Sequence, residues 1–106
     1  TRDVLPIHTL PTVSNGRRIR IAGVVTHRQR PATAAGITFL ALEDETGVAN
    51  IICTPGVWRS YRTVARRAQA LEVRGIVQHG DGALAVRADR LVPLRLPVTS
   101  RSRDFQ

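Results

Sequence analysis

The residue types that could perform catalysis are scattered along this sequence and form no cluster. It contains three histidines, His8, His27 and His79, and a single cysteine, Cys53. A structural zinc site needs four ligands at close spacing, and a catalytic nucleophile needs a neighbouring base. The histidines share no motif, and we interpret Cys53 as a small core residue and the acidic run at 43–45 as part of a turn. We therefore expect no metal, no cofactor and no enzymatic activity in this chain alone.

The charge of the chain predicts binding instead of catalysis. Its 106 residues include 16 basic and 8 acidic ones, which gives a formal net charge of +8, and every basic residue is arginine. The planar guanidinium group binds two phosphate oxygens at once and also stacks on bases. A charge of this sign and size favours a polyanionic partner.

Length and composition indicate one folded domain. A chain of 106 residues with 42% hydrophobic residues has enough apolar material for a single modest core. The apolar runs are too short to span a membrane, and no signal peptide is visible, so we expect no membrane partner. The sequence contains no methionine, and we interpret it as a piece of a longer protein.

Five segments have the alternating pattern of β-strands. They are residues 17–27, 37–43, 48–54, 70–78 and 83–91. We interpret residues 27–36 as a loop, and the stretches around 44–47 and 79–82 as hairpin turns. Gly23 lies inside the first strand, where a glycine often marks a bulge or a sharp bend.

One segment changes to helical spacing. Pro55 suits the first turn of a helix, and apolar residues then recur every three or four positions as far as Ala68. We expect the Trp58 and Tyr61 side of this helix to face the core. The order of three strands, one helix and two strands predicts an all-β, five-stranded OB-fold, which is a Greek-key barrel. We divide the chain into a lead-in segment (1–16), with one helical turn around residues 8–13, the OB-fold domain (17–95) and a flexible basic tail (96–106).

OB-folds bind oligonucleotides on the face of strands two and three, between the first loop and the loop that joins strands four and five. Binding of a single strand needs basic groups for phosphates and an aromatic platform for bases. The second of these loops begins at His79. The first loop supplies the candidate contacts His27, Arg28, Gln29 and Arg30.

Two further candidates lie on the second and third strands. Alternation places Phe39 on the face opposite the apolar pair Leu40 and Leu42, yet it leaves open whether Phe39 belongs to the core or to a binding groove. Asn50 is unfavourable in an apolar core, so we place it on the groove face, where its amide can bond a base edge or simply face solvent.

The segment IRIAGVVTHRQRPATAAGITFLALEDETGVANIICTP resembles the OB domain of bacterial C-family (DnaE-type) DNA polymerases, and the terminal SRSRDFQ resembles the error-prone, ImuC-type branch. The resemblance implies a non-catalytic part of a translesion DNA polymerase in the cytoplasm. The whole system would include ImuA/ImuB-type accessory proteins and the sliding clamp. Related anticodon-binding domains stack an aromatic residue on a base at the position of Phe39 and read a base at the position of Asn50, which favours the groove for Phe39.

One loop departs from the family pattern. Replicative members commonly carry a Thr-Lys-Lys-Gly-like loop, whereas residues 33–36 here are Thr-Ala-Ala-Gly. Two basic contacts are therefore missing, and Arg28 and Arg30 are the residues that we expect to compensate.

Three functions are compatible with these observations. The first is a module that binds single-stranded DNA near a polymerase. The second is a protein-docking module that recruits accessory proteins, with an incidental basic surface. The third is a tRNA anticodon-binding domain. The third is disfavoured by the tail ending in SRDFQ, because such domains usually precede the catalytic domain in class II synthetases. The sequence does not decide between the first two.

Overall fold

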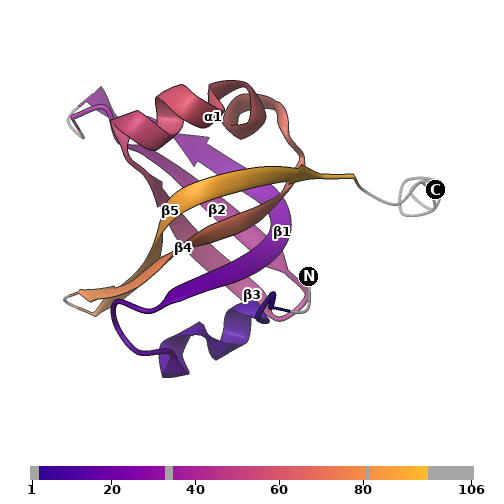
Figure 1. Ribbon diagram of the computed structural model, residues 1–106, viewed down its shortest axis with the longest axis vertical. Coiled ribbons are helices and arrows are strands. Elements are labelled where there is room, and N and C mark those ends of the chain that lie inside the picture. Colours follow the sequence, from indigo (N-terminus) through magenta and orange to yellow (C-terminus); the bar gives the residue numbers. More distant parts are fainter. Residues whose placement is uncertain (1–2, 33–34, 81, 96–106) are drawn as a thin grey trace.

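The protein is a closed five-stranded barrel, which confirms the predicted OB-fold (Figure 1). The computed structural model describes residues 3–32, 35–80 and 82–95. The elements are the 3-10 helix η1 (Ile7–Thr12), the strands β1 (Arg18–Gln29), β2 (Thr38–Asp44) and β3 (Gly47–Cys53), the helix α1 (Pro55–Arg67), and the strands β4 (Ala70–Gly80) and β5 (Ala83–Leu94). The strand order around the barrel is β1-β2-β3-β5-β4, and all neighbouring strands are antiparallel except β3 and β5, which are parallel. The predicted tail (96–106) lies outside the described residues.

The first strand bends so that its two halves belong to different parts of the barrel. Residues 18–24 pair with β4, whereas residues 24–29 pair with β2. Gly23 lies at this change of partner, as the sequence predicts. A Cβ atom at Gly23 would lie 2.4 Å from the backbone oxygen of Glu43, so no other residue fits there without moving the strands.

β1 is longer than the sequence predicted. Residues 27–29 were expected in a loop, but they continue the strand, and Gln29 pairs with Phe39 on β2. The polar run His-Arg-Gln resembles a loop in sequence because none of its side chains is buried. A strand at the rim of a barrel needs no apolar residue at these positions, so backbone pairing with β2 decides the structure. A β-bulge between Val25 and His27 adjusts the register just before this extension.

The core fills the barrel, and short helices cover its two ends. α1 covers one end and buries Trp58 and Ala65, which confirms the predicted core-facing side of this helix (Figure 1). η1 lies at the opposite end, close to the predicted helical turn, and buries Ile7 and Leu10. Cys53 is fully buried in the core, and burial raises the pKa of its thiol to about 11. In the part of the chain that the structure describes, no helix is long and apolar enough to cross a membrane.

Asp44 organises the turn between β2 and β3, as expected for the acidic run. Its Oδ1 accepts hydrogen bonds from the backbone N–H groups of Thr46 (2.7 Å) and Gly47 (3.0 Å), and its Oδ2 accepts one from the N–H of Ile7 (2.9 Å). Burial opposes the charged form of this carboxyl, but these hydrogen bonds and one from the Thr46 hydroxyl outweigh it and lower the pKa. The turn therefore also fastens η1 to the barrel.

Candidate nucleic-acid interface

A shallow hollow of about 200 Å³ lies on the outward face of β1, β2 and β3. We call it the outer groove and define it by the outward side chains that line it: His27, Gln29, Phe39, Ala41 and Asn50. Four of these five were candidate contacts in the sequence. The structure brings them together because the register pairs His27 with Ala41 and Ala41 with Asn50, and places Gln29 beside Phe39.

Phe39 lies outside the core. It is only partly buried, whereas its neighbours Thr38 and Leu40 are buried on the other side of β2. The face that alternation assigned to Phe39 is thus confirmed. Beside it on β2 is Ala41, whose small side chain leaves the ring accessible from the hollow. A planar, partly exposed ring in a shallow hollow is suited to stacking on a base.

Asn50 is exposed at the centre of β3, and its neighbours Ala49 and Ile51 are buried. This confirms the predicted face of β3. Asn50 lies between two alanines, because it pairs with Ala41 on β2 and with Ala85 on β5. These small neighbours leave its amide free to donate to and accept from a base edge.

Arg28 does not line the outer groove. Its Nε donates a 2.6 Å hydrogen bond to the backbone oxygen of Ala65, and its Nη2 donates to the backbone oxygen of Ala68. Both oxygens are at the C-terminal end of α1, where the last carbonyls lack partners within the helix and a cation is favourable. Arg28 therefore fastens the helix to β1, and its expected contact with phosphate stays a prediction.

The two remaining candidates also lie away from the outer groove. The guanidinium group of Arg30 lies over the ring of Trp58, 5.4 Å from the ring centroid, in a cation–π contact. His79 lies in the β4–β5 hairpin, where its backbone N–H donates to Asn15 Oδ1 (2.8 Å) and its ring Nε2 lies 2.8 Å from the oxygen of Val13. In the loops themselves, residues 33, 34 and 81 lie outside the described residues.

One basic neighbour of the groove was missed in the sequence. Arg87 on β5 is exposed and pairs with Ile52, which in turn pairs with Phe39. The alternation of β5 shows that Arg87 faces outward, because Val86 and Ala88 are buried. Its place beside the groove depends on the parallel pairing of β3 with β5, for which the sequence carries no local signal.

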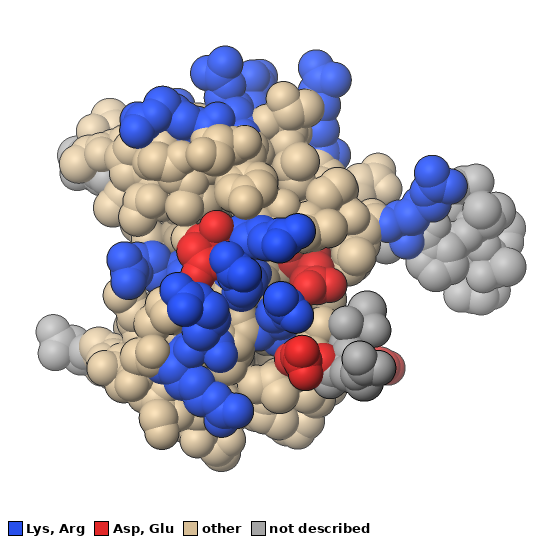
Figure 2. Space-filling model, in the orientation of Figure 1, with Lys and Arg blue, Asp and Glu red and all other residues tan. Residues whose placement is uncertain are grey.

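Arginines gather on a second surface, made by β1, β4 and β5 (Figure 2). We call it the arginine face and define it by Arg18, Arg20, Arg74 and Arg90. The register places Arg20, Arg74 and Arg90 side by side on three adjacent strands. Two hollows, of about 540 Å³ and about 260 Å³, lie among these side chains.

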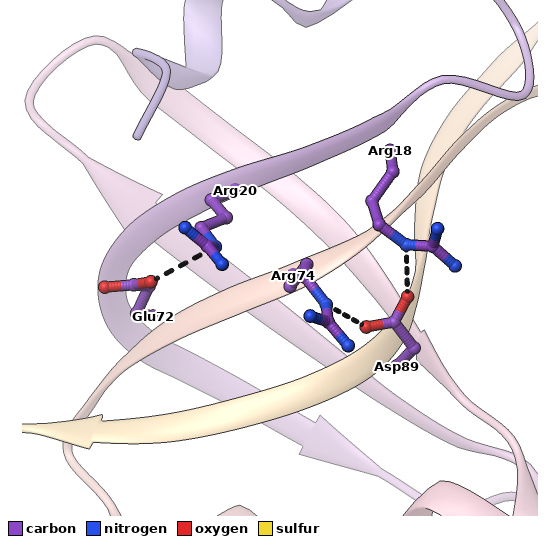
Figure 3. Close-up of polar contacts among 5 residues, drawn as sticks. All are labelled: Arg18, Arg20, Glu72, Arg74 and Asp89. Carbon is purple, nitrogen blue, oxygen red and sulfur yellow. Dashed lines mark hydrogen bonds and ion pairs between the residues drawn. The ribbon is translucent and has the colours of Figure 1, made fainter. Parts of the chain in front are cut away.

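Carboxylates organise the arginine face (Figure 3). Asp89 accepts a 2.9 Å hydrogen bond from Arg18 Nε and a 2.6 Å hydrogen bond from Arg74 Nε. Burial opposes the charged form of Asp89, but the hydrogen bonds and charges of Arg74 and Arg18 outweigh it and lower the pKa. Arg20 is paired more loosely, with Nε 3.8 Å from Glu72 Oε2. Among the described residues, no group of three or more His, Cys, Asp or Glu side chains is placed to hold a metal.

Comparisons with known proteins agree with this geometry. The profile of a family described as "OB-fold nucleic acid binding domain" matches residues 19–94. The chain is 58% identical over 106 residues to an error-prone DNA polymerase of Cutibacterium acnes, with 99% of the chain covered, and 57% identical over 103 residues to one of Mycobacterium tuberculosis, with 97% covered. In each case it spans only 9% of the relative's length.

A solved structure shows the same fold at low sequence identity. A small single-stranded DNA binding protein from Mycoplasma pneumoniae superimposes with a TM-score of 0.63 and 7% identity, covering 81% of this chain and 100% of the other. At this identity the likeness concerns the fold alone.

Proposed function

The chain belongs to the family of OB-fold nucleic acid binding domains, and from this membership we propose that it binds single-stranded DNA through the outer groove, as a non-catalytic part of an error-prone DNA polymerase. The observation that carries the proposal is the grouping of Phe39, Asn50, His27 and Gln29 around one hollow. An aromatic ring supplies stacking energy, and the amide and imidazole groups can bond the edges of bases.

The composition of the groove predicts weak and unselective binding. Phe39 is its single aromatic residue, and none of its five defining residues carries a formal charge when His27 is neutral. Stacking tolerates any base because every base has a π-face, whereas specificity needs several fixed hydrogen bonds. Arg28 is nearer in the register but is hydrogen-bonded to α1, so the nearest basic residue on the outward face is Arg87, two strands from Phe39.

The parent protein is part of the same proposal. Identity of 57–58% over almost the whole chain supports a parent that resembles error-prone DNA polymerases. Catalysis would then lie elsewhere in the longer protein, and this domain would hold the template strand during translesion synthesis and damage-induced mutagenesis. ImuA/ImuB-type accessory proteins and the sliding clamp would be partners of the whole polymerase in the cytoplasm.

One observation favours the alternative, a protein-docking module. Val24 and Val48 are 42% and 58% exposed, and both pair with Glu43 in one row across β1, β2 and β3. Exposed apolar residues on a sheet are a common element of protein interfaces. This row lies next to the outer groove, because Glu43 and Ala41 are alternate outward residues of β2.

The test is a titration of fluorescent oligo-dT at low and moderate salt with wild type, Phe39→Ala and Phe39→Leu. Loss of stacking should weaken binding by about 1–3 kcal/mol in both variants. Phe39→Leu should keep the melting temperature, because it retains an apolar side chain at a partly buried position. Asn50→Ala should likewise weaken binding without loss of stability.

Salt dependence supplies the second readout. The logarithm of the affinity should fall with the logarithm of salt, with a slope of roughly −0.7 per phosphate contact. No binding even at low salt, or affinity that is independent of both salt and Phe39, would favour the docking function instead.

A further inference from the structure

One row of paired residues runs around the barrel from the outer groove to the arginine face. From Phe39 it passes to Ile52 on β3, to Arg87 on β5, to Ile76 on β4 and to Arg18 on β1. Neighbouring strands lie about 4.8 Å apart, so four strand spacings, about 19 Å, separate the ends of this row. Arg87 lies halfway between the two surfaces.

The path along this row suits a nucleic acid strand. Its intermediate residues are neutral or basic, so no carboxylate repels a phosphate on the way. Even at the rise of about 3.4 Å per nucleotide found in duplex DNA, about six nucleotides cover this distance, and a stretched single strand needs fewer. OB-folds engage about 4–16 nucleotides, so the distance is within their range.

Arg18 ends the row. Arg74 and Arg90, which pair with each other on β4 and β5, lie next to the row, and all three arginines still have donors available. Arg18 and Arg74 each donate to Asp89 through Nε (Figure 3). Neither guanidinium makes another hydrogen bond to a described residue, so the four Nη hydrogens of each are available to phosphate oxygens. Arg90 is exposed and makes no ion pair with any residue that the structure describes.

Resting on the proposed function, we propose that a DNA single strand bound in the outer groove continues across Arg87 onto the arginine face, where Arg18, Arg74 and Arg90 contact its phosphates. The two surfaces then have different tasks. The outer groove holds bases by stacking, and the arginine face holds the sugar-phosphate backbone of the nucleotides that follow.

The proposal predicts a length-dependent effect of Arg90. Fluorescent oligo-dT of about 3 nucleotides is too short to cover the row from Phe39 to Arg18, whereas one of about 12 nucleotides also reaches the arginine face. Arg90→Glu should lower the affinity of the longer probe about tenfold, leave the shorter probe within about twofold, and reduce the salt slope of the longer probe by about 0.7 or more. Arg87→Gln should weaken both probes.

Arg62→Glu is the matched control. Arg62 is exposed like Arg90, and its substitution by Glu changes the net charge by the same amount. Arg62 also has basic neighbours within one helical turn, just as Arg90 has Arg74 opposite it on β4. It lies on α1, outside the proposed path, and should leave both probes within about twofold. Equal losses from Arg90→Glu and Arg62→Glu would show a general charge effect and overturn the proposal.

Further outcomes separate this proposal from the function on which it rests. If Phe39→Leu weakens both probes but Arg90→Glu acts equally on both lengths or on neither, the outer groove stands and the extended path is overturned. If the longer probe does not bind wild type at low salt, the proposed function itself fails. If Arg90→Glu abolishes binding of polyglutamate but spares both DNA probes, the arginine face recognises acidic protein segments instead.

Discussion

The outer groove and the arginine face occupy different parts of one barrel and differ in almost every chemical respect. The groove has one aromatic ring, an asparagine, a glutamine and a histidine around a hollow of about 200 Å³. The arginine face has four arginines, two of which, Arg18 and Arg74, share the carboxylate of Asp89, and it has no aromatic residue among its defining side chains. The net charge of +8 therefore favours a polyanion without locating the groups that contact its bases. In this molecule the clustered arginines and the groove with its single phenylalanine are separated on the surface.

The largest expected loss of stability comes from substituting Gly23, because β1 contributes residues to both surfaces and bends at this glycine. Arg18 and Arg20 precede the bend, and His27 and Gln29 follow it. Gly23→Val places a side chain against the backbone of Glu43 and should cost about 3 kcal/mol of unfolding free energy. Urea denaturation followed by circular dichroism measures this. Gly80→Val is the control, since nothing lies within 4 Å of a Cβ there. Equal stability of the two variants would show that the bend does not need glycine.

A second prediction uses the carboxylate that organises the arginine face. The pKa of Asp89 is lowered in the folded protein, as is that of Asp44 in the β2–β3 turn. A carboxyl group whose pKa is lower in the folded protein than in the unfolded chain stabilises the folded state at pH values above its unfolded pKa of about 4. This stabilisation is lost as the pH falls through the pKa that the group has in the folded protein.

The melting temperature should therefore fall as the pH is lowered from about 5 to about 2. Asp89→Asn should flatten part of this dependence, because the amide cannot titrate. Asp3→Asn is the control: Asp3 is largely exposed and lies 3.7 Å from Arg20, too far for a hydrogen bond. An unchanged pH profile in Asp89→Asn would contradict the role of this carboxylate.

The smallest expected effect is that of substituting Arg28. This substitution tests whether Arg28 has a structural role or contacts DNA. Arg28→Gln removes charged donors from the carbonyls of Ala65 and Ala68 and should lower stability by about 1 kcal/mol. Its effect on oligo-dT affinity should match that of Arg62→Gln, which removes the same charge from α1. Weaker DNA binding at unchanged stability would instead support the phosphate contact predicted from the sequence.

Local patterns in the sequence predicted most of the fold and which side chains line the outer groove from β2 and β3. Alternation assigned the faces of Phe39 and Asn50, and the change to helical spacing located α1. Both are local properties, since side-chain direction follows directly from the backbone period. Gly23 indicated the bend in β1, because a glycine inside a strand usually marks a bulge, a bend or a close approach of another backbone.

The remaining features depend on contacts between distant segments. Arg28 resembled a loop residue because the helix carbonyls that hold it lie 37 and 40 positions away in the sequence. Arg87 reaches the groove through the parallel register of β3 and β5, which no hairpin turn fixes. The arginine face likewise forms only when the barrel closes between β1 and β4, which brings Arg20 beside Arg74.

The most direct test of the outer groove is an NMR titration of the ¹⁵N-labelled chain with oligo-dT of about 12 nucleotides at low salt. We predict that the largest amide shifts occur at residues 27–29, 39–41 and 50–52, with smaller shifts at 87 and on the arginine face. Shifts confined to α1 or to the row of Val24 and Val48, or no shifts at all, would contradict the assignment of the outer groove as the DNA-binding surface.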